Sequence, residues 1–265
     1  MYDFNYHKPA TIDEAKALLD GNDEAKLLSG GMTMLPTMKM RLAQPSDLID
    51  LSGIDSLSGI EVTGDSVTIG AMTTHAAVAA SNDVRAAIPA LAELAASIGD
   101  AQVRNRGTIG GSIANSDPAA DYPAAVLGLN ATVVTDNREI AADDFFTGMF
   151  ETALADGEIV TAVRFPKPER AAYAKFPNPA SRYAVAGVMV AQSGNDIRVA
   201  VTGAGASAFR AGNLEAALAG TFSAAALEGL SIDATELNSD LHASADYRAH
   251  LVMVLAKRAV AAAGG

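Results

Sequence analysis

Two glycine-rich segments of the chain combine the residue types that bind phosphate groups through the backbone. The first is Ser29-Gly30-Gly31-Met32-Thr33, and the second is Thr108-Ile109-Gly110-Gly111-Ser112. Glycine has no Cβ, so backbone N–H groups beside it can approach an anion closely and form a nest around it. A single pair of glycines is usually a turn, but two such segments lying together could bracket a pyrophosphate. The pair therefore indicates a dinucleotide-binding site.

The second segment is followed by side chains that suit the hydroxyl groups of a sugar or polyol. Residues 115–121, Asn-Ser-Asp-Pro-Ala-Ala-Asp, supply two carboxylates together with Asn and Ser. A carboxylate repels phosphate, so Asp117 and Asp121 should face a ribose or ribityl chain and not the pyrophosphate. Asp121 has a second interpretation that fits equally well, as the N-cap of a helix beginning at Tyr122.

Short strands and helices are expected to position the first segment. Thr11 and Glu14 have the spacing of a capping box for a helix that ends at Asp20-Gly21-Asn22. A strand running into the glycines and a helix after them is a layout in which the start of a helix faces a phosphate. The chain has no Gly-x-Gly-x-x-Gly fingerprint and no P-loop. Strands are predicted at Asp3–Tyr6, Lys26–Ser29 and Asp47–Leu51, and Met34, Leu35, Met38 and Leu42 repeat at helical spacing.

From about residue 59 the pattern changes. Gly64-Asp65-Ser66 predicts a hairpin turn, and residues 99–121 predict a long irregular loop of the kind that is usually functional. Pro166-Lys167-Pro168 is the predicted domain boundary. Helices are predicted at Thr74–Ala80, Asp83–Ile98, Tyr122–Leu129 and, with breaks, across Leu214–Ala263. Further strands are predicted at Ala131–Thr135, Glu158–Phe165, Tyr183–Ala191 and Ile197–Thr202.

Composition excludes several classes of function. A formal charge of −12 and the absence of Trp argue against a nucleic-acid-binding surface. The absence of cysteine excludes disulfides, thiol catalysis and iron–sulfur ligation by this chain, and the four histidines lack metal-ligand spacing. No apolar run is long enough for a membrane span, and no secretory signal is visible at the N-terminus, so a cytoplasmic location is expected.

Four stretches carry a resemblance to a known family. They are Tyr6-His7-Lys8-Pro9, residues 29–39 from Ser29 to Lys39, Ile69-Gly70-Ala71-Met72-Thr73-Thr74, and residues 104–121, Arg-Asn-Arg-Gly-Thr-Ile-Gly-Gly-Ser-Ile-Ala-Asn-Ser-Asp-Pro-Ala-Ala-Asp. Over essentially its whole length the chain resembles the flavin-binding medium subunit of the molybdenum hydroxylase family, which includes carbon monoxide dehydrogenase, xanthine dehydrogenase and aldehyde oxidoreductases.

The resemblance implies an α+β fold with a two-part FAD-binding domain of the vanillyl-alcohol-oxidase (PCMH) type. That domain would span residues 1–168, divided near 55–58, and a small α+β C-terminal flavoprotein domain of antiparallel strands and helices would span 169–265. It also implies that the two glycine segments hold the FAD pyrophosphate with backbone amides. The residues in question are Ser29, Gly30, Gly31, Met32, Thr33, Thr108, Ile109, Gly110, Gly111 and Ser112.

Five further cofactor-binding residues follow from the resemblance. Asp121 matches the acidic residue of the family, Lys175 the lysine near the flavin ring, and Tyr183 the residue that lies against the isoalloxazine. Ile98 and Ile159 fall where apolar residues line the cofactor. The alternatives are a solvated cation for Lys175 and a packed strand residue for Tyr183. One departure is that related subunits often carry His-Ser where this chain has Met32-Thr33.

The function implied is that of an electron-transfer subunit without catalytic or metal-binding residues of its own. FAD would pass electrons from iron–sulfur clusters on a small partner subunit to an external acceptor, and a large partner subunit would hold molybdopterin. A dimer of heterotrimers is expected. Two alternatives stay open: a free-standing FAD oxidase, for which His75 is the central candidate base, and an assembly subunit without cofactor.

Overall fold

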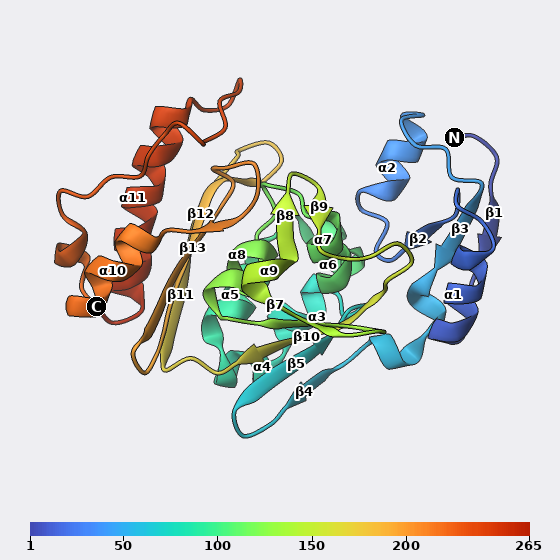
Figure 1. Ribbon diagram of the computed structural model, residues 1–265, viewed down its shortest axis with the longest axis horizontal. Helices are drawn as coiled ribbons and strands as arrows, with labels where there is room; N and C mark the ends of the chain where they lie inside the picture. Colours follow the sequence, from blue (N-terminus) through green and yellow to red (C-terminus); the bar gives the residue numbers. More distant parts are fainter.

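The computed structural model describes residues 1–265 as three parts arranged in a row (Figure 1). The N-terminal part lies at one end, a five-stranded sheet with its helices lies in the middle, and a four-stranded sheet with long helix α11 lies at the other end. The predicted α+β class is confirmed. None of the helices combines the length and apolar character needed to cross a bilayer.

The N-terminal part is a small parallel sheet covered by helices. Its strands β1 (Asn5–His7), β2 (Lys26–Leu28) and β3 (Asp47–Asp50) lie in the order β1-β3-β2, and its helices are α1 (Ile12–Asp20) and α2 (Met34–Lys39). The hydroxyl of Thr11 accepts a bond from the Glu14 amide at 3.2 Å, so the predicted cap of α1 is confirmed. Two short 3-10 turns, η1 (Leu51–Gly53) and η2 (Asp55–Leu57), lead into the middle part.

The middle part is an antiparallel sheet in the order β4-β5-β10-β6-β7. These strands are β4 (Ile60–Val62), β5 (Ser66–Gly70), β6 (Thr132–Thr135), β7 (Glu139–Ala141) and β10 (Val160–Pro166). Five helices share its core, namely α3 (His75–Ala80), α4 (Asn82–Ala87), α5 (Pro89–Ser97), α7 (Ile109–Asn115) and α8 (Tyr122–Gly128), and α6 (Ala101–Arg106) lies against α3. Short helix α9 (Ala142–Phe145) and the hairpin of β8 (Phe146–Gly148) and β9 (Glu151–Thr152) complete it.

Two predictions for this part were wrong. Residues 99–121 contain helices α6 and α7, because Asp100 and Thr108 cap them by accepting bonds from the amides of Val103 and Gly111. The single helix expected at Asp83–Ile98 is two helices, since the chain leaves helical geometry at Ile88, before Pro89.

The C-terminal part is an antiparallel sheet in the order β11-β12-β13-β14, packed between α11 on one face and helices of the middle part on the other (Figure 1). Its strands are β11 (Arg170–Pro177), β12 (Ala184–Ser193), β13 (Asp196–Thr202) and β14 (Phe209–Arg210). Its helices are α10 (Gly212–Gly220), η3 (Ala224–Leu227) and α11 (Ala245–Ala262). Strand β12 alternates between two cores: Met189 packs with the middle part, while Val188 and Val190 pack under α11.

Candidate cofactor site

The two glycine segments touch each other directly. A Cβ on Gly30 would lie 2.1 Å from the carbonyl oxygen of Arg106, and a Cβ on Gly111 would lie 2.3 Å from the hydroxyl oxygen of Ser29. Side chains do not tolerate such distances, so only glycine permits this approach. Gly31 adds a φ of +73°, which lets the chain turn from β2 toward α2. The fold therefore joins two segments that are about eighty residues apart.

The two segments use their backbone amides differently. The amides of Gly30, Gly31, Met32 and Thr33 donate to no protein acceptor. In the second segment, by contrast, Ile109 donates to Thr73, Gly110 to Ala71, and Gly111 and Ser112 to Thr108, at distances of 2.9 to 3.1 Å. In this structure the first segment presents free N–H donors, whereas the amides of residues 109–112 are already bonded to other residues of the protein.

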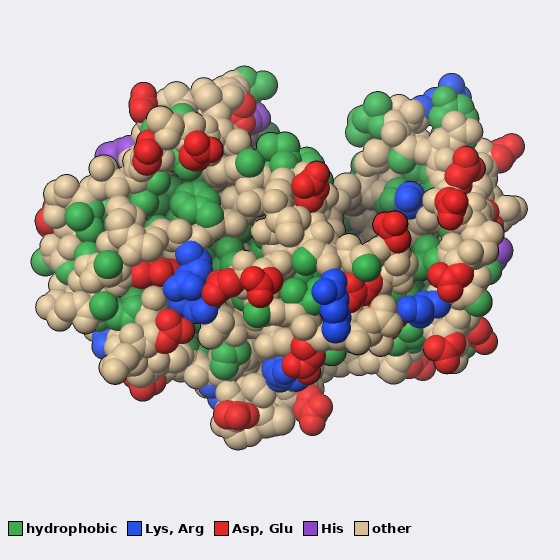
Figure 2. Space-filling model, viewed as in Figure 1, with side chains coloured by type: hydrophobic (Ala, Val, Ile, Leu, Met, Phe, Trp, Pro, Cys, Tyr) green, Lys and Arg blue, Asp and Glu red, His purple; other side chains and the backbone are tan.

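Both segments line one cavity of about 640 Å³, a size typical of small-molecule sites. Figure 2 shows the molecule hollowed between the N-terminal part on the right and the rest. Two of the predicted site residues lie outside the lining: Ile109 is fully buried in the core, and Lys175 stands behind Asp121. The predicted residues that line it are Ser29, Gly30, Gly31, Met32, Thr33, Ile98, Thr108, Gly110, Gly111, Ser112, Asp121, Ile159 and Tyr183.

Asp121 is held by two side chains of strand β11. Its Oδ2 accepts a bond from Lys175 Nζ at 2.8 Å, and its Oδ1 accepts one from the Tyr173 hydroxyl at 2.5 Å. The side chains of Asp121 and Lys175 are only 4% and 7% exposed, so Lys175 is not a solvated cation. Asp121 occupies the N-cap position of α8, as the second interpretation expected, but its side chain makes no capping bond there. Burial raises the pKa of Asp121, and the charge and hydrogen bond of Lys175 oppose this, followed by the bond from Tyr173.

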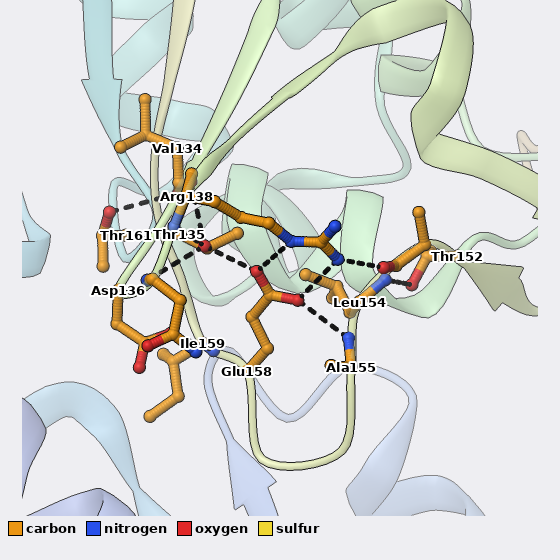
Figure 3. Close-up of polar contacts among 12 residues, drawn as sticks. Val134, Thr135, Asp136, Arg138, Thr152, Leu154, Ala155, Glu158, Ile159 and Thr161 are labelled. Atoms are coloured by element: carbon orange, nitrogen blue, oxygen red, sulfur yellow. Dashed lines mark hydrogen bonds and ion pairs between the residues drawn. The ribbon is translucent and has the colours of Figure 1, made fainter.

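A second buried carboxylate, which the sequence did not single out, supports the wall that carries Ile159 (Figure 3). Glu158 accepts two bonds from Arg138, at 2.9 and 3.0 Å, one from the Thr135 hydroxyl at 2.7 Å and one from the Ala155 amide at 2.8 Å. These donors, led by Arg138, lower the pKa of Glu158 to about 2. The network ties the β6–β7 turn to the chain entering β10.

Asp136, in the same turn, links the middle part to the N-terminal part. One carboxylate oxygen accepts a bond from the Ile159 amide at 2.8 Å, and the other pairs with Lys16 on α1. The pair of Lys16 and Asp136 joins residues that are 120 positions apart, so no local sequence pattern predicts it.

His75 is the one histidine of the four that stands at the candidate site. It is 4% exposed, lines the cavity, and its Nδ1 has no partner. Burial first, and then the charge of Arg104, lowers its pKa to about 4, so the ring is neutral at physiological pH. In contrast to His75, Tyr183 and Met32 are exposed, at 47% and 38%, at the rim of the cavity.

Comparisons with known proteins agree with this architecture. Residues 2–168 match the family model described as "FAD binding domain in molybdopterin dehydrogenase", and residues 171–263 match "CO dehydrogenase flavoprotein C-terminal domain". The carbon monoxide dehydrogenase medium chain of Hydrogenophaga pseudoflava is 40% identical, with 98% of this chain and 96% of that one aligned. The nicotine 6-hydroxylase medium subunit of Paenarthrobacter nicotinovorans is 38% identical over the same shares.

A solved structure of carbon monoxide dehydrogenase from H. pseudoflava superposes with a TM-score of 0.90 at 38% identity, covering 99% of this chain and 98% of that chain. The alignments extend through both glycine segments and through the C-terminal sheet. The chain therefore belongs to the family of FAD-binding medium subunits of molybdenum hydroxylases, as its sequence motifs predicted.

Proposed function

We propose that the cavity between the glycine segments binds FAD and that the chain works as the electron-transfer subunit of a molybdenum hydroxylase. The observation that carries the proposal is the direct packing of Gly30 against Arg106 and Gly107, just before the second segment, and of Gly111 against Ser29, at the wall of one cavity. Because a side chain at either position would separate the segments, the glycines preserve a shape that a bound group can use. Bound FAD supplies the redox chemistry that no side chain of this chain provides.

The residues of the cavity fit such a cofactor. The free amides of Gly30–Thr33 suit the pyrophosphate, and the cavity also offers hydroxyl side chains at Ser29, Thr33 and Ser112. Asp121 suits hydroxyl groups of the ribose or ribityl chain, and Ile98 and Ile159 offer apolar surface. Tyr183, at the rim, is proposed to lie against the ring. Lys175 is proposed to influence the flavin ring indirectly, because its ammonium group is paired with the carboxylate of Asp121, which neutralises the lysine charge.

The proposed partners are a large molybdopterin-binding subunit and a small iron–sulfur subunit. Relatives that are 38% and 40% identical over nearly the whole chain are themselves medium subunits, which supports a multi-subunit complex. We further propose a dimer of heterotrimers, a cytoplasmic location, and domains at residues 1–168, divided near 55–58, and 169–265. The spans of the two family models support that domain boundary.

Purification of the tagged chain from its native host, with analysis of released cofactors and co-purifying proteins, tests the function. FAD together with a large molybdenum subunit and a small cysteine-rich subunit is expected. FAD on a solitary chain that oxidises a substrate would favour a free-standing oxidase, with His75 as its base. Partners without flavin would leave an assembly role and refute the site.

Gel filtration and light scattering of the purified complex test the dimer of heterotrimers. Fractionation of the host cells tests the location.

A further inference from the structure

The C-terminal sheet holds the turn that leads into Asp121 by hydrogen bonds to its backbone carbonyl groups. The Thr202 hydroxyl donates to the carbonyl oxygens of Pro118 and Ala120 at 3.0 and 2.6 Å. The Gly203 amide donates to Pro118 at 2.7 Å, and the Ala184 amide donates to Ala119 at 3.2 Å. Each of the three residues before Asp121 is thus fixed by β12, by β13 or by the residue that follows β13.

The same sheet also fixes the carboxylate of Asp121. Tyr173 and Lys175 are two positions apart on β11, so their side chains leave the same face of the sheet and reach one oxygen each. Gly187, opposite Lys175 on β12, leaves the room that the phenol needs, since a Cβ there would lie 2.3 Å from the Tyr173 hydroxyl oxygen. The site is built for this hydroxyl.

The carboxylate keeps capacity for a ligand. An ionised carboxylate accepts about four hydrogen bonds, two for each oxygen, and the sheet supplies one to each oxygen. Asp121 lines the cavity, so the remaining positions are available to hydroxyl groups of a bound molecule. A carboxylate held at both oxygens has a fixed orientation and loses little further freedom when a ligand binds.

We propose that Tyr173 is a positioning residue for the cofactor, whose hydroxyl holds the Asp121 carboxylate in the orientation that receives the cofactor hydroxyls. The C-terminal domain thereby forms part of the FAD site without Tyr173 itself lining the cavity. This inference rests on the proposed function, because it requires that the cavity bind FAD.

The test is FAD titration of the Tyr173→Phe protein, with Tyr6→Phe as the matched control. Tyr6 makes the same kind of bond, from its hydroxyl to Asp50 at 2.5 Å, but outside the cavity. We expect Tyr173→Phe to bind FAD about tenfold more weakly than wild type, since a hydrogen bond to a charged group is removed. Tyr6→Phe should bind FAD as wild type does. Gly187→Ala, which displaces the phenol without removing a polar atom, should reproduce the loss.

A pH profile of FAD affinity separates positioning from a general structural role. The ionisable groups around Asp121 are Lys175, Tyr173, Tyr122 and Tyr183. The bond from Tyr173 favours the ionised carboxylate, so its removal raises the pKa of Asp121. Acidification should therefore begin to weaken FAD binding at a higher pH in Tyr173→Phe than in wild type.

Each outcome has a distinct meaning. A wild-type chain that binds no FAD refutes the proposed function itself. A wild-type chain that binds FAD, with Tyr173→Phe equal to Tyr6→Phe in affinity and pH profile, overturns only the positioning role. A Tyr173→Phe protein that fails to fold also overturns it, because the hydroxyl would then be required for stability and not for the site.

Discussion

Substituting Gly30 by alanine is the sharpest test of the paired glycine segments. The added methyl group would lie 2.1 Å from the Arg106 carbonyl oxygen, and ordinary contact begins at 3.4 Å, so the segments must separate by about 1.3 Å. The atoms that block it belong to the backbone of residues 106 and 107, which is less able to yield than the end of a long side chain. Overpacking of this kind costs about 1–3 kcal/mol.

If that cost is met by separating the segments, FAD binding weakens by roughly tenfold to a hundredfold. The assay is titration with FAD followed by flavin absorbance, together with thermal unfolding of the apoprotein. Gly64→Ala is the matched control, because a Cβ on Gly64 meets nothing within 4 Å. Equal FAD affinity in the Gly30→Ala and Gly64→Ala proteins would refute the reasoning that close packing of the segments shapes the site.

Three further predictions concern stability. Lys175→Met should lower the free energy of unfolding by about 3–5 kcal/mol, because it leaves a buried carboxylate unpaired. Lys257→Met, which breaks an exposed pair, should lower it by only about 0–1 kcal/mol. Urea unfolding at pH 7 measures both, and equal effects would contradict the prediction. The pair of Arg138 and Glu158 stabilises the fold at pH values above the usual glutamate pKa of 4.5, and that contribution is lost as the pH falls toward about 2. In Glu158→Gln the free energy of unfolding should therefore change less with pH in this range. An unchanged slope of unfolding free energy against pH would argue against this prediction. Phe150 is 56% exposed with a φ of +57°, so Phe150→Gly should raise the unfolding free energy by about 1 kcal/mol, and a lower melting temperature would show that its side chain has an unrecognised packing role.

Local signals in the sequence predicted the elements that depend on neighbouring residues. The capping box of Thr11 and Glu14 predicted α1, and the turn residues Gly64-Asp65-Ser66 predicted the hairpin of β4 and β5. The caps Asp100 and Thr108 were equally local, but the abundance of Gly, Asn and Asp around them indicated a loop. Burial of Ile109 and Ile113 outweighs the low helix propensity of that segment.

Most of the residues that the family resemblance predicted do line the cavity, yet the resemblance did not predict the side chains that support the lining. Tyr173 meets Asp121 across 52 residues, and Arg138 meets Glu158 across 20. Such pairs arise when strands from distant segments are brought together, and no periodicity in one sequence encodes which side chains meet. Strand β11 itself was missed, so the common face of Tyr173 and Lys175 was not visible.

Because one face of β12 packs in the core of the middle part, the two domains share an apolar interface, while residues of the C-terminal domain alone form the core under α11. Met189 packs against α8 at Gly128, where an added Cβ would lie 2.6 Å from the methionine side chain, while Val188 and Val190 lie under α11. A chain that ends after Pro168 would expose α8 to water, and the remaining residues alone would expose one face of their sheet. The middle and C-terminal parts should therefore melt as one cooperative unit and protect their amides from exchange together.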